Sequence, residues 1–493
     1  MPSNYKVAML NDFSPGLNVD LPEELVHRKE LTIAKNADIL SRGGIKKRFG
    51  NEQKNSTSYS AQVENLTEWT KPNGDKPKLA LIGSDLCTLD SSYAKTSIQT
   101  LANKQLPHFS FQGKFYFIDG NEYYEYDGSS VSAVTPDGSS DNDLSPIRKC
   151  KYAIRHPKSN RFFFAGNPDD VGAVYYSEYN APNYVKNTSV VYPQENEGEV
   201  IGIRLMLDAV LIFYRNGIQV WRGQDPEKNA VWEQVPTSHG ALSSDAIEMT
   251  TQAMLTLSDA GLYALGPNII GVPMGTETEG RFIDNVAKDR VMSIINSITN
   301  PETAVSLFDR ANQELYIAFC DDGTGRNNKV LVYNFSTKGF SLYEDISIND
   351  FLQLDDNTIL AGTENYIIEM NTGTSDVNVS NGGENIIDFA IQTSELNLEQ
   401  PFNRKKVEQV FIKFRNYGSS HSFDITLMVD GEIEQTYTIS GDDNKPQVMT
   451  HRKKTTLVGN TFKIKIDESM YSEMEIYSIG FVYKVVRTDG EIV

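Results

Sequence analysis

The residues that could carry out chemistry are scattered through this sequence. Its histidines show neither HExxH nor HxH spacing, so they predict no metal site; they are His27, His108, His156, His239, His421 and His451. The three cysteines, Cys87, Cys150 and Cys320, lie far apart and outside any CxxC pattern, which predicts neither a disulfide framework nor a zinc site. GxSxG, SxxK, phosphate-loop and dinucleotide-binding patterns are absent from the sequence. We therefore expect no cofactor, no bound metal and no enzymatic activity.

Two acidic stretches resemble known functional loops. Asp321 and Asp322 open a DDGTG sequence like the start of a calcium loop, but the later ligands of such a loop are missing, which favours a hairpin turn. The segment SDAGLY, residues 258–263, is similar to the Asp-box turn of sialidase-type propellers, which stabilises a fold and does not hydrolyse. Glycosidases need two carboxylates at a fixed separation, and nothing in the sequence ranks one acidic pair above another.

Charge is distributed unevenly. The chain has 46 Lys and Arg against 66 Asp and Glu, a net charge of −20, which argues against a nucleic-acid clamp. Residues 351–400 contain 9 acids and no base, whereas residues 401–493 contain 13 of each. Basic triplets occur near both ends of the chain: Lys46, Lys47, Arg48; Arg404, Lys405, Lys406; and Arg452, Lys453, Lys454. They are either solvated loop charges or an interface to an acidic partner surface, such as a neighbouring copy.

The elements that would position these residues are almost all strands. From about residue 77 to 372, short runs of alternating apolar residues are separated by turn sequences every eight to twelve residues, and larger units recur at roughly 40–50 residues. This period predicts a β-propeller of five to seven blades; a series of sandwiches would explain the strands but not the regular spacing. Two segments have helical composition, Leu21–Leu40 and Asp284–Ile298.

We expect an all-β chain with three parts. Residues 1–54 form an N-terminal arm with one short helix, residues 55–375 form the propeller, and residues 376–493 form a β-sandwich-like domain. The stretch 373–385, rich in Gly, Ser and Asn, is interpreted as a linker or long loop before the sandwich. The arm and the sandwich are expected to pack together as a platform outside the propeller. No apolar run is long enough to cross a membrane, and no export signal is recognised at the N-terminus.

The first fifty residues resemble the opening of the propeller-type tail nozzle, tail hub or packaged-DNA stabilisation proteins of short-tailed bacteriophages. The matching residues are Gly16-Leu17-Asn18, Ala34 to Asn36, Gly43-Gly44 and Lys46-Lys47-Arg48, with Phe49 in place of the usual proline before Gly50. A second similarity is His239-Gly240 followed by LTLSDAGLYALGPN, where Ala260 replaces an expected glycine. The order of arm, propeller and terminal sandwich is the third.

The resemblance implies a virion structural protein. Its expected role is that of one subunit of a homo-oligomeric, hexameric ring below the portal and its adaptor, assembled in the host cytoplasm and located in the virion tail. Such a ring continues the DNA exit channel, retains DNA and supports fibres or spikes. Double-stranded DNA would pass through the lumen without specific binding, which suits an acidic wall, and Asp321 and Asp322 are candidates for that wall. The alternative is a carbohydrate-binding or carbohydrate-cleaving propeller that acts on host surface glycans.

Overall fold

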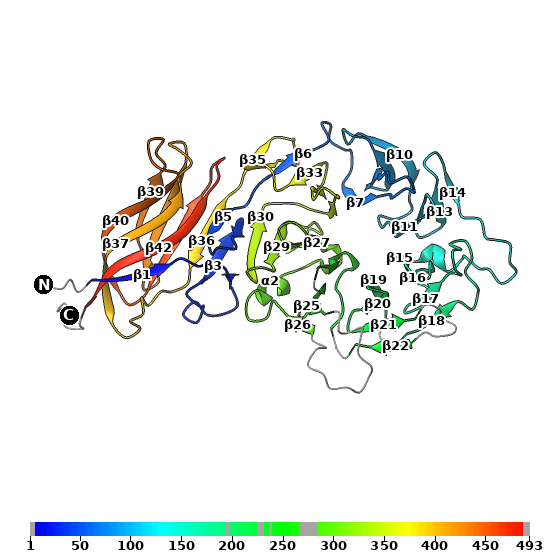
Figure 1. The fold of residues 1–493 in the computed structure, drawn as a ribbon, viewed down its shortest axis with the longest axis horizontal. Helices are drawn as coiled ribbons and strands as arrows, with labels where there is room; N and C mark the ends of the chain where they lie inside the picture. The colour runs from blue at the N-terminus through cyan, green and yellow to red at the C-terminus, as the bar shows by residue number, and fades with distance from the viewer. Residues whose placement is uncertain are drawn as a thin grey trace.

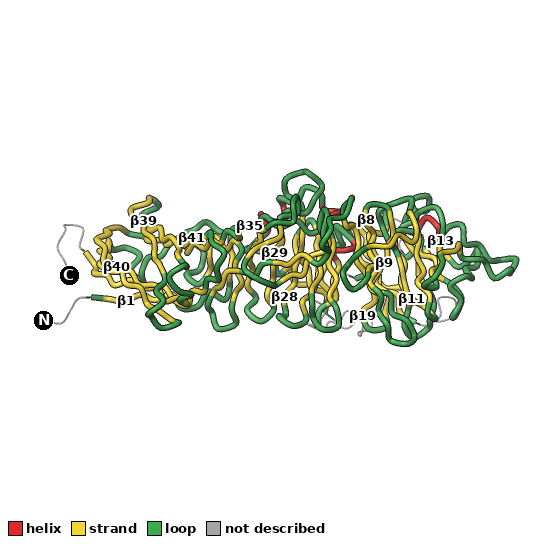
Figure 2. Tube along the Cα trace, turned by 90° about the horizontal axis from the view of Figure 1, so that it is seen from above, coloured by secondary structure: helices red, strands yellow, loops and turns green. Residues whose placement is uncertain are grey.

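The computed structural model describes residues 5–193, 198–223, 231–235, 239–251, 253–266 and 283–486. Strands make up 49% and helices 3%, so the prediction of an all-β chain is confirmed. The molecule is elongated, with a ring of small sheets at one end and a sandwich at the other (Figures 1 and 2). We retain the names propeller and sandwich for these two parts.

Six four-stranded antiparallel sheets, and a four-stranded antiparallel unit that is part of a larger sheet, β27–β30, follow one another through the described residues of the propeller. The first four are β7–β10 (Val63–Glu68, Lys78–Ile82, Asp85–Leu89, Lys95–Thr100), β11–β14 (His108–Phe111, Lys114–Ile118, Tyr123–Tyr126, Val131–Ala133), β15–β18 (Tyr152–Arg155, Phe162–Ala165, Val174–Tyr176, Val190–Val191) and β19–β22 (Val200–Met206, Ala209–Tyr214, Ile218–Arg222, Val231–Gln234). The others are β23–β26 (Ile247–Met249, Met254–Ser258, Gly261–Leu265, Ile283–Asn285), β27–β30 (Val305–Asp309, Glu314–Phe319, Lys329–Asn334, Gly339–Glu344) and β31–β33 (Asp350–Gln353, Ile359–Gly362, Ile367–Met370) completed by β6 (Asn51–Gln53). The first strand of each sheet from β11 to β27 contacts the first strand of the next sheet, and β31 contacts β7 of the first sheet.

The middle strands are apolar on both faces because each sheet is packed between two others. In β16, Phe162 and Phe164 pack against the preceding sheet, whereas Phe163 packs against the following one, where Trp221 lies 4.6 Å away between ring centroids. A strand buried on both faces reads as a continuous apolar run and not as an alternation. This explains why FFFA in β16 and AVLIFY in β20 are entirely buried.

The propeller is closed by a strand from the N-terminal arm. β6 pairs antiparallel with β33, so that Ile368 faces Gln53 and Met370 faces Asn51. Residues 51–53, which we expected within the arm, therefore form the outer strand of the last sheet. The hydrogen bonds of this pairing join segments more than 300 residues apart in the sequence.

The C-terminal part is a sandwich of two sheets. One sheet contains β37 (Arg404–Arg415), β40 (Val448–Gly459) and β42 (Glu475–Val486); the other contains β36 (Phe389–Thr393), β38 (Ser422–Val429), β39 (Glu432–Ser440) and β41 (Phe462–Glu468). Alternate residues of both sheets, such as Ile412 and Ile464, are buried in a common core. Period-2 alternation and one buried face are typical of such strands.

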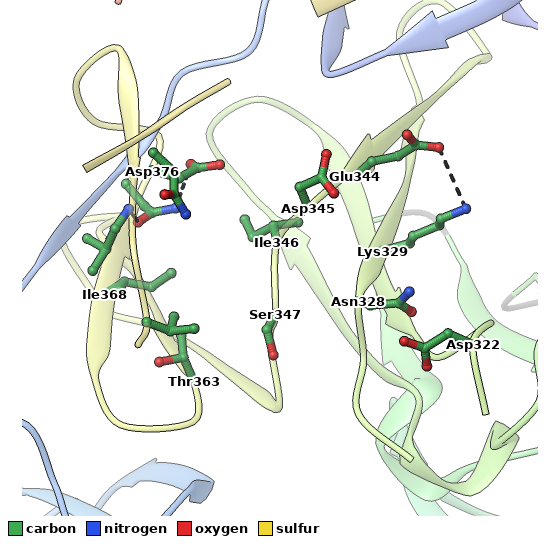
Figure 3. A pocket seen from close by; sticks show the side chains of 14 residues that line it. Asp322, Asn328, Lys329, Glu344, Asp345, Ile346, Ser347, Thr363, Ile368 and Asp376 are labelled. Atoms are coloured by element: carbon green, nitrogen blue, oxygen red, sulfur yellow. Dashed lines mark hydrogen bonds and ion pairs between the residues drawn. The ribbon is translucent and has the colours of Figure 1, made fainter. Parts of the chain in front are cut away.

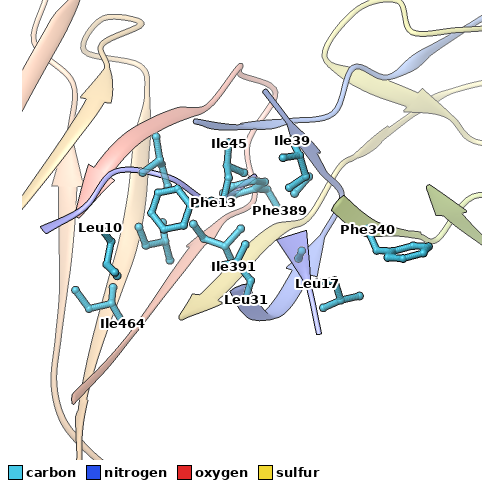
Figure 4. Close-up of a cluster of buried hydrophobic side chains, with 14 of the residues drawn as sticks. Leu10, Phe13, Leu17, Leu31, Ile39, Ile45, Phe340, Phe389, Ile391 and Ile464 are labelled. Atoms are coloured by element: carbon cyan, nitrogen blue, oxygen red, sulfur yellow. The ribbon is translucent and has the colours of Figure 1, made fainter. Parts of the chain in front are cut away.

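The N-terminal arm joins both parts through backbone pairing. β1 (Lys6–Leu10) and β5 (Ile45–Lys47) pair with β42, and β4 (Ala37–Ile39) pairs with β5. β2 (Gly16–Leu17) and β3 (Glu30–Lys35) lie between β30 of the propeller and β36 of the sandwich, which creates one ten-stranded sheet across both parts. Apolar side chains from the arm and both parts share one core (Figure 4). The platform of arm and sandwich is thus continuous with the propeller.

The helix predicted within Leu21–Leu40 is wrong. Pro22 accepts hydrogen bonds from Leu25 and Val26, which form a single turn, and β3 and β4 follow. Helix propensity is weak, and here strand pairing of Leu31 and Ala34 with β36 outweighs it. The segment 284–298 contains the short helix α2 (Met292–Asn296); single 3-10 turns occur at η1 (Ile147–Lys149), η2 (Ser244–Ala246) and η3 (Pro301–Thr303).

The stretch interpreted as a linker contains a hairpin. β34 (Ser375–Val377) and β35 (Glu384–Ile386) pair with each other, and Asp376, the middle residue of β34, is buried. A free linker would leave its polar side chains in water. This segment instead fixes a carboxylate inside the protein, close to the arm.

Candidate functional site

The candidate site is the joint where the arm meets the propeller and the sandwich, because the first basic triplet lies there. Lys47 is the last residue of β5, and its side chain is buried. Its Nζ lies 2.7 Å from Glu468 Oε2 and donates to the carbonyl of Met470 at 2.6 Å. The two side chains are 1% and 0% exposed. Burial lowers the pKa of Lys47 and raises that of Glu468. The ion pair is therefore a structural contact between arm and sandwich.

Arg48 forms a second buried ion pair, with the hairpin. Its Nη1 donates to Asp376 Oδ1 at 2.9 Å and its Nη2 donates to Asp376 Oδ2, while Asn51 Nδ2 donates to Oδ1 at 2.7 Å. The Arg48 and Asp376 side chains are 2% and 7% exposed. This two-pronged contact fits the planar guanidinium, which binds a carboxylate with two parallel hydrogen bonds.

Asn36 connects all three parts at this joint. Its Oδ1 accepts from Arg48 Nε at 2.9 Å and from the backbone N–H of Glu344 in β30 at 3.0 Å, and its Nδ2 donates to the carbonyl of Asp388 at 2.8 Å. Its φ of 51° lies in the left-handed region, which asparagine tolerates better than most residues. Asn36 is one of the residues that carry the family resemblance.

Glycines of the same resemblance lie where chains approach closely. A Cβ at Gly16, whose φ is 67°, would lie 2.3 Å from the carbonyl oxygen of Phe340. A Cβ at Gly50 would lie 1.9 Å from the carbonyl oxygen of Ser375. Both positions therefore exclude a side chain, one beside β30 and the other beside β34.

Three of the nine predicted interface cations are buried within the chain, which corrects that prediction for them. Lys47 and Arg48 form the ion pairs above, and Lys405 donates to the carbonyl of Gln400 at 2.9 Å, with burial lowering its pKa to about 8. A buried cation must be paired or hydrogen-bonded, so these three hold the chain together and are not presented to a partner. For Lys47 and Arg48 the sequence alone did not reveal this, because their acidic partners lie 421 and 328 residues away.

The other six cations are at least partly accessible. Lys46 lies 3.2 Å from Asp38 and 4.0 Å above the Phe49 ring. The remaining five lie on β37 and β40 of the sandwich: Arg404, Lys406, Arg452, Lys453 and Lys454. Of these, Arg404, Arg452 and Lys454 are exposed.

Asp321 and Asp322 lie in the loop between β28 and β29. Asp322 lines a pocket formed by residues of both the sixth and the seventh sheet (Figure 3). Asp321 Oδ2 lies 2.7 Å from Lys329 Nζ; burial opposes its ionisation, but hydrogen bonds from Lys329 and Asn328 outweigh this and lower its pKa. Hydrogen bonds from Thr324 lower the pKa of Asp322, which is exposed. Both carboxylates are therefore negative at neutral pH, but Lys329 compensates the charge of Asp321, so Asp322 is the one of the two that adds to a repulsive surface.

Besides Asp322, the pocket is lined by three carboxylates whose charges are already neutralised. Asp376 is bound by Arg48, Glu344 lies 3.6 Å from Lys329, and Asp345 lies 3.2 Å from Lys35. An acid and base for hydrolysis would need to face a substrate and not a neighbouring cation. Within the described residues, no group of three or more His, Cys, Asp or Glu side chains could hold a metal ion.

Sequence reasoning missed Asp376 and Glu468, and no pattern in the sequence marks them. It also missed Lys413. Strand alternation in FIKF places Lys413 on the same face as Phe411, and this pattern could have revealed it.

Among the described helices, none is long and apolar enough to span a membrane.

Comparisons with known proteins give distant structural likenesses only. No family model and no curated protein matches the chain. The extracellular domain of a proposed one component system from B. thetaiotaomicron aligns with a TM-score of 0.41 and 11% identity, over 81% of this chain and 48% of its own, so this chain spans about half its length. An exo-β-1,3-galactanase from Phanerochaete chrysosporium aligns with a TM-score of 0.27 and 11% identity, over 86% and 100%. PorZ of the Porphyromonas gingivalis type-IX secretion system aligns with a TM-score of 0.36 and 11% identity, over 62% and 36%. With TM-scores below 0.5, these likenesses indicate no function for this chain.

Proposed function

We propose that this chain is a structural subunit of a short-tailed bacteriophage tail. In this proposal several copies form a ring-shaped nozzle or hub below the portal and adaptor, which extends the DNA exit channel and carries fibres or spikes. The subunit has no catalytic role. It is assembled in the host cytoplasm and is located in the virion tail.

The observation that carries the proposal is the position of the resembling residues in the joint. Gly16, Asn36, Arg48 and Gly50 all lie where the arm crosses between propeller and sandwich, and each has a contact that few other residue types could make. A short, degenerate sequence likeness gains weight when its residues are those on which the architecture depends.

The construction of the joint also suits a subunit of a rigid ring. Domains within one chain usually meet through exposed linkers and move relative to one another. Here a ten-stranded sheet and two buried ion pairs connect the parts, so the propeller and the sandwich are held in one orientation. Fixed orientation is what a part of a channel wall needs, whereas a sensor or catalytic lid needs mobility.

The acidic surface suits the passage of DNA. Proteins hold DNA through Lys and Arg contacts to phosphates, and such contacts would retain a strand in transit. In this proposal acidic surface lines the lumen and repels the polyanion; exposed Asp322 is a candidate for it, whereas Asp321 is already paired with Lys329. Duplex DNA passes without specific binding.

The test is the mass of the assembled protein. The purified chain is measured by native mass spectrometry and analytical ultracentrifugation, alone and with purified portal–adaptor complexes of short-tailed phages. The proposal predicts a closed ring of about six copies, formed alone or on the adaptor. A chain that stays monomeric in both conditions and that binds or cleaves surface polysaccharides would contradict it and support the carbohydrate-directed alternative.

A further inference from the structure

The outer face of one sandwich sheet is open to solvent in the described structure. We define the sandwich outer face as the outward residues of β1, β42, β37 and β40, opposite the core. Cross-strand register places Met9, Gly480, Phe411 and Arg452 in one row and Val7, Val482, Gln409 and Lys454 in the next. Val7 is 59% exposed and Met9 50% exposed. An apolar row on an outer sheet face is unusual unless something covers it.

The apolar part of this face is preformed. Gly480 lies beneath the Phe411 ring, and a Cβ at this glycine would lie 2.0 Å from Phe411 Cζ. The ring therefore rests directly on the backbone of β42. Beside it is a shallow hollow lined by Met9, Phe411, Lys413, Thr450, Arg452 and Val482.

The same face is strongly basic, although the chain is acidic. Its acids, Glu408 and Glu475, are already paired, with Lys484 at 3.2 Å and with Arg415 at 3.2 Å. Lys413, Arg452 and Lys454 form no ion pair with the described part of the chain. Three uncompensated cations around an apolar platform call for an acidic partner.

A matching acidic surface lies at the opposite end of the molecule. Residues 127–147 contain no Lys or Arg, and the loop after β14 carries Asp137, Asp141 and Asp143. This acidic loop, residues 134–146, is farthest from the sandwich along the longest axis (Figure 1). It is held in place, since the backbone N–H of Asp143 donates to the carbonyl of Val185 at 2.8 Å and Asn187 donates to that of Asp141 at 2.8 Å.

We infer that the sandwich outer face binds the acidic loop of a second copy of this chain, head to tail. Complementary surfaces at opposite ends of one molecule make a heterologous contact, which closes into a ring or continues as a filament. The inference rests on the proposed ring and names the surfaces that would build it. Charge pairing fixes the register, and Val7, Met9 and Phe411 supply the apolar area that becomes buried.

The test uses two charge-reversed forms of the full chain. The face variant carries Lys413→Glu, Arg452→Glu and Lys454→Glu; the loop variant carries Asp137→Lys, Asp141→Lys and Asp143→Lys. The control, Lys288→Glu, Lys338→Glu and Lys445→Glu, makes the same change of charge as the face variant at three exposed lysines outside both surfaces. Self-association is measured by sedimentation at low and at physiological salt, with circular dichroism as a check on folding.

Each reversed form alone should self-associate about 100-fold more weakly than the wild type, because like charges then face each other. The control should associate like the wild type at physiological salt. An equimolar mixture of the two reversed forms should recover association, because the acidic face of one form then meets the basic loop of the other. This recovery is specific to a pairing of these two surfaces.

Unchanged assembly of both reversed forms, or no recovery in the mixture, would overturn the inference while leaving the proposed ring standing. A wild type that binds duplex DNA through the face, without self-association, would also overturn it, because the occupant would then be a polyanion. A wild type that never forms a ring, even with the adaptor, would remove the proposed function itself.

Discussion

Replacing His421 with phenylalanine should stabilise the sandwich, and more at pH 5 than at pH 8. The His421 side chain is 0% exposed, and neither ring nitrogen has a hydrogen-bond partner within the described residues. It packs between Tyr417 and Phe423, with ring centroids 5.7 and 5.5 Å away. Phenylalanine keeps these aromatic contacts and removes two unpaired polar atoms, whose burial costs about 1–3 kcal/mol.

The pH dependence follows from the pKa of His421. Burial, and then the positive charge of Lys47, lower this pKa from 6.5 to about 4. The unfolded chain therefore binds a proton as the pH falls through 6.5, whereas the folded chain binds it only near 4, so the wild type loses stability over this window as the pH falls. At pH 5 the loss is about 2 kcal/mol relative to pH 8, and the phenylalanine variant does not share it.

The assay must report on the sandwich separately, because all three tryptophans, Trp69, Trp221 and Trp232, lie in the propeller. Hydrogen exchange of peptides from β38, measured by mass spectrometry across a urea series, follows the sandwich, and tryptophan fluorescence follows the propeller. His27→Phe, at an exposed position, controls for the loss of a histidine. A His421→Phe variant with the same stability gain at pH 5 and pH 8, or with lower stability at both, would refute the reasoning.

Three further predictions concern the joint. Asn36→Ala should lower the free energy of unfolding by about 3 kcal/mol, since three hydrogen bonds are lost; a loss below about 1 kcal/mol in urea denaturation would contradict this. Arg48→Ala should cost about 3–5 kcal/mol, because Asp376 is left buried without its cation, whereas Arg48→Met combined with Asp376→Leu should recover most of the loss; faster proteolysis within residues 373–386 in the single variant alone checks this. Gly50→Ala should weaken the closure of the propeller, because its Cβ would meet a carbonyl oxygen, and should speed hydrogen exchange in β33; Gly266→Ala, which has open space around its Cβ, is the control and should leave β33 unchanged.

Much of the fold could be predicted from the sequence because strands carry local patterns. Turn pairs such as Asn216-Gly217 and alternating aromatic runs mark the hairpins of the propeller, and the longer alternation in residues 404–415 marks a sandwich strand. The helix expected in Leu21–Leu40 was wrong. Its residues are good helix formers, but pairing with strands that are distant in the sequence decides their structure. β3 pairs with β36, about 360 residues later in the chain, and no local pattern encodes that pairing.

The candidate site was less accessible to sequence reasoning. A run of three basic residues such as Lys46-Lys47-Arg48 has the same sequence whether its side chains face water or the interior. Here strand alternation places Lys46 on the partly exposed side of β5 and Lys47 in the core. Whether a cation is buried depends on its carboxylate, and Glu468 and Asp376 come from opposite ends of the C-terminal part. Only three-dimensional pairing assigns these partners.

The pairing of β6 with β33, and of β1 with β42, has a consequence for the order of folding during synthesis. The ribosome synthesises β6 some 310 residues before its partner strand β33. β1 cannot pair until residues 479–483 of β42 have been synthesised. Until then the arm is an unpaired strand edge exposed to other chains, and contacts of such long sequence separation close slowly. We expect release of the chain, and not the growth of the propeller, to limit maturation, and a nascent chain stopped before residue 470 to remain aggregation-prone with a protease-sensitive arm.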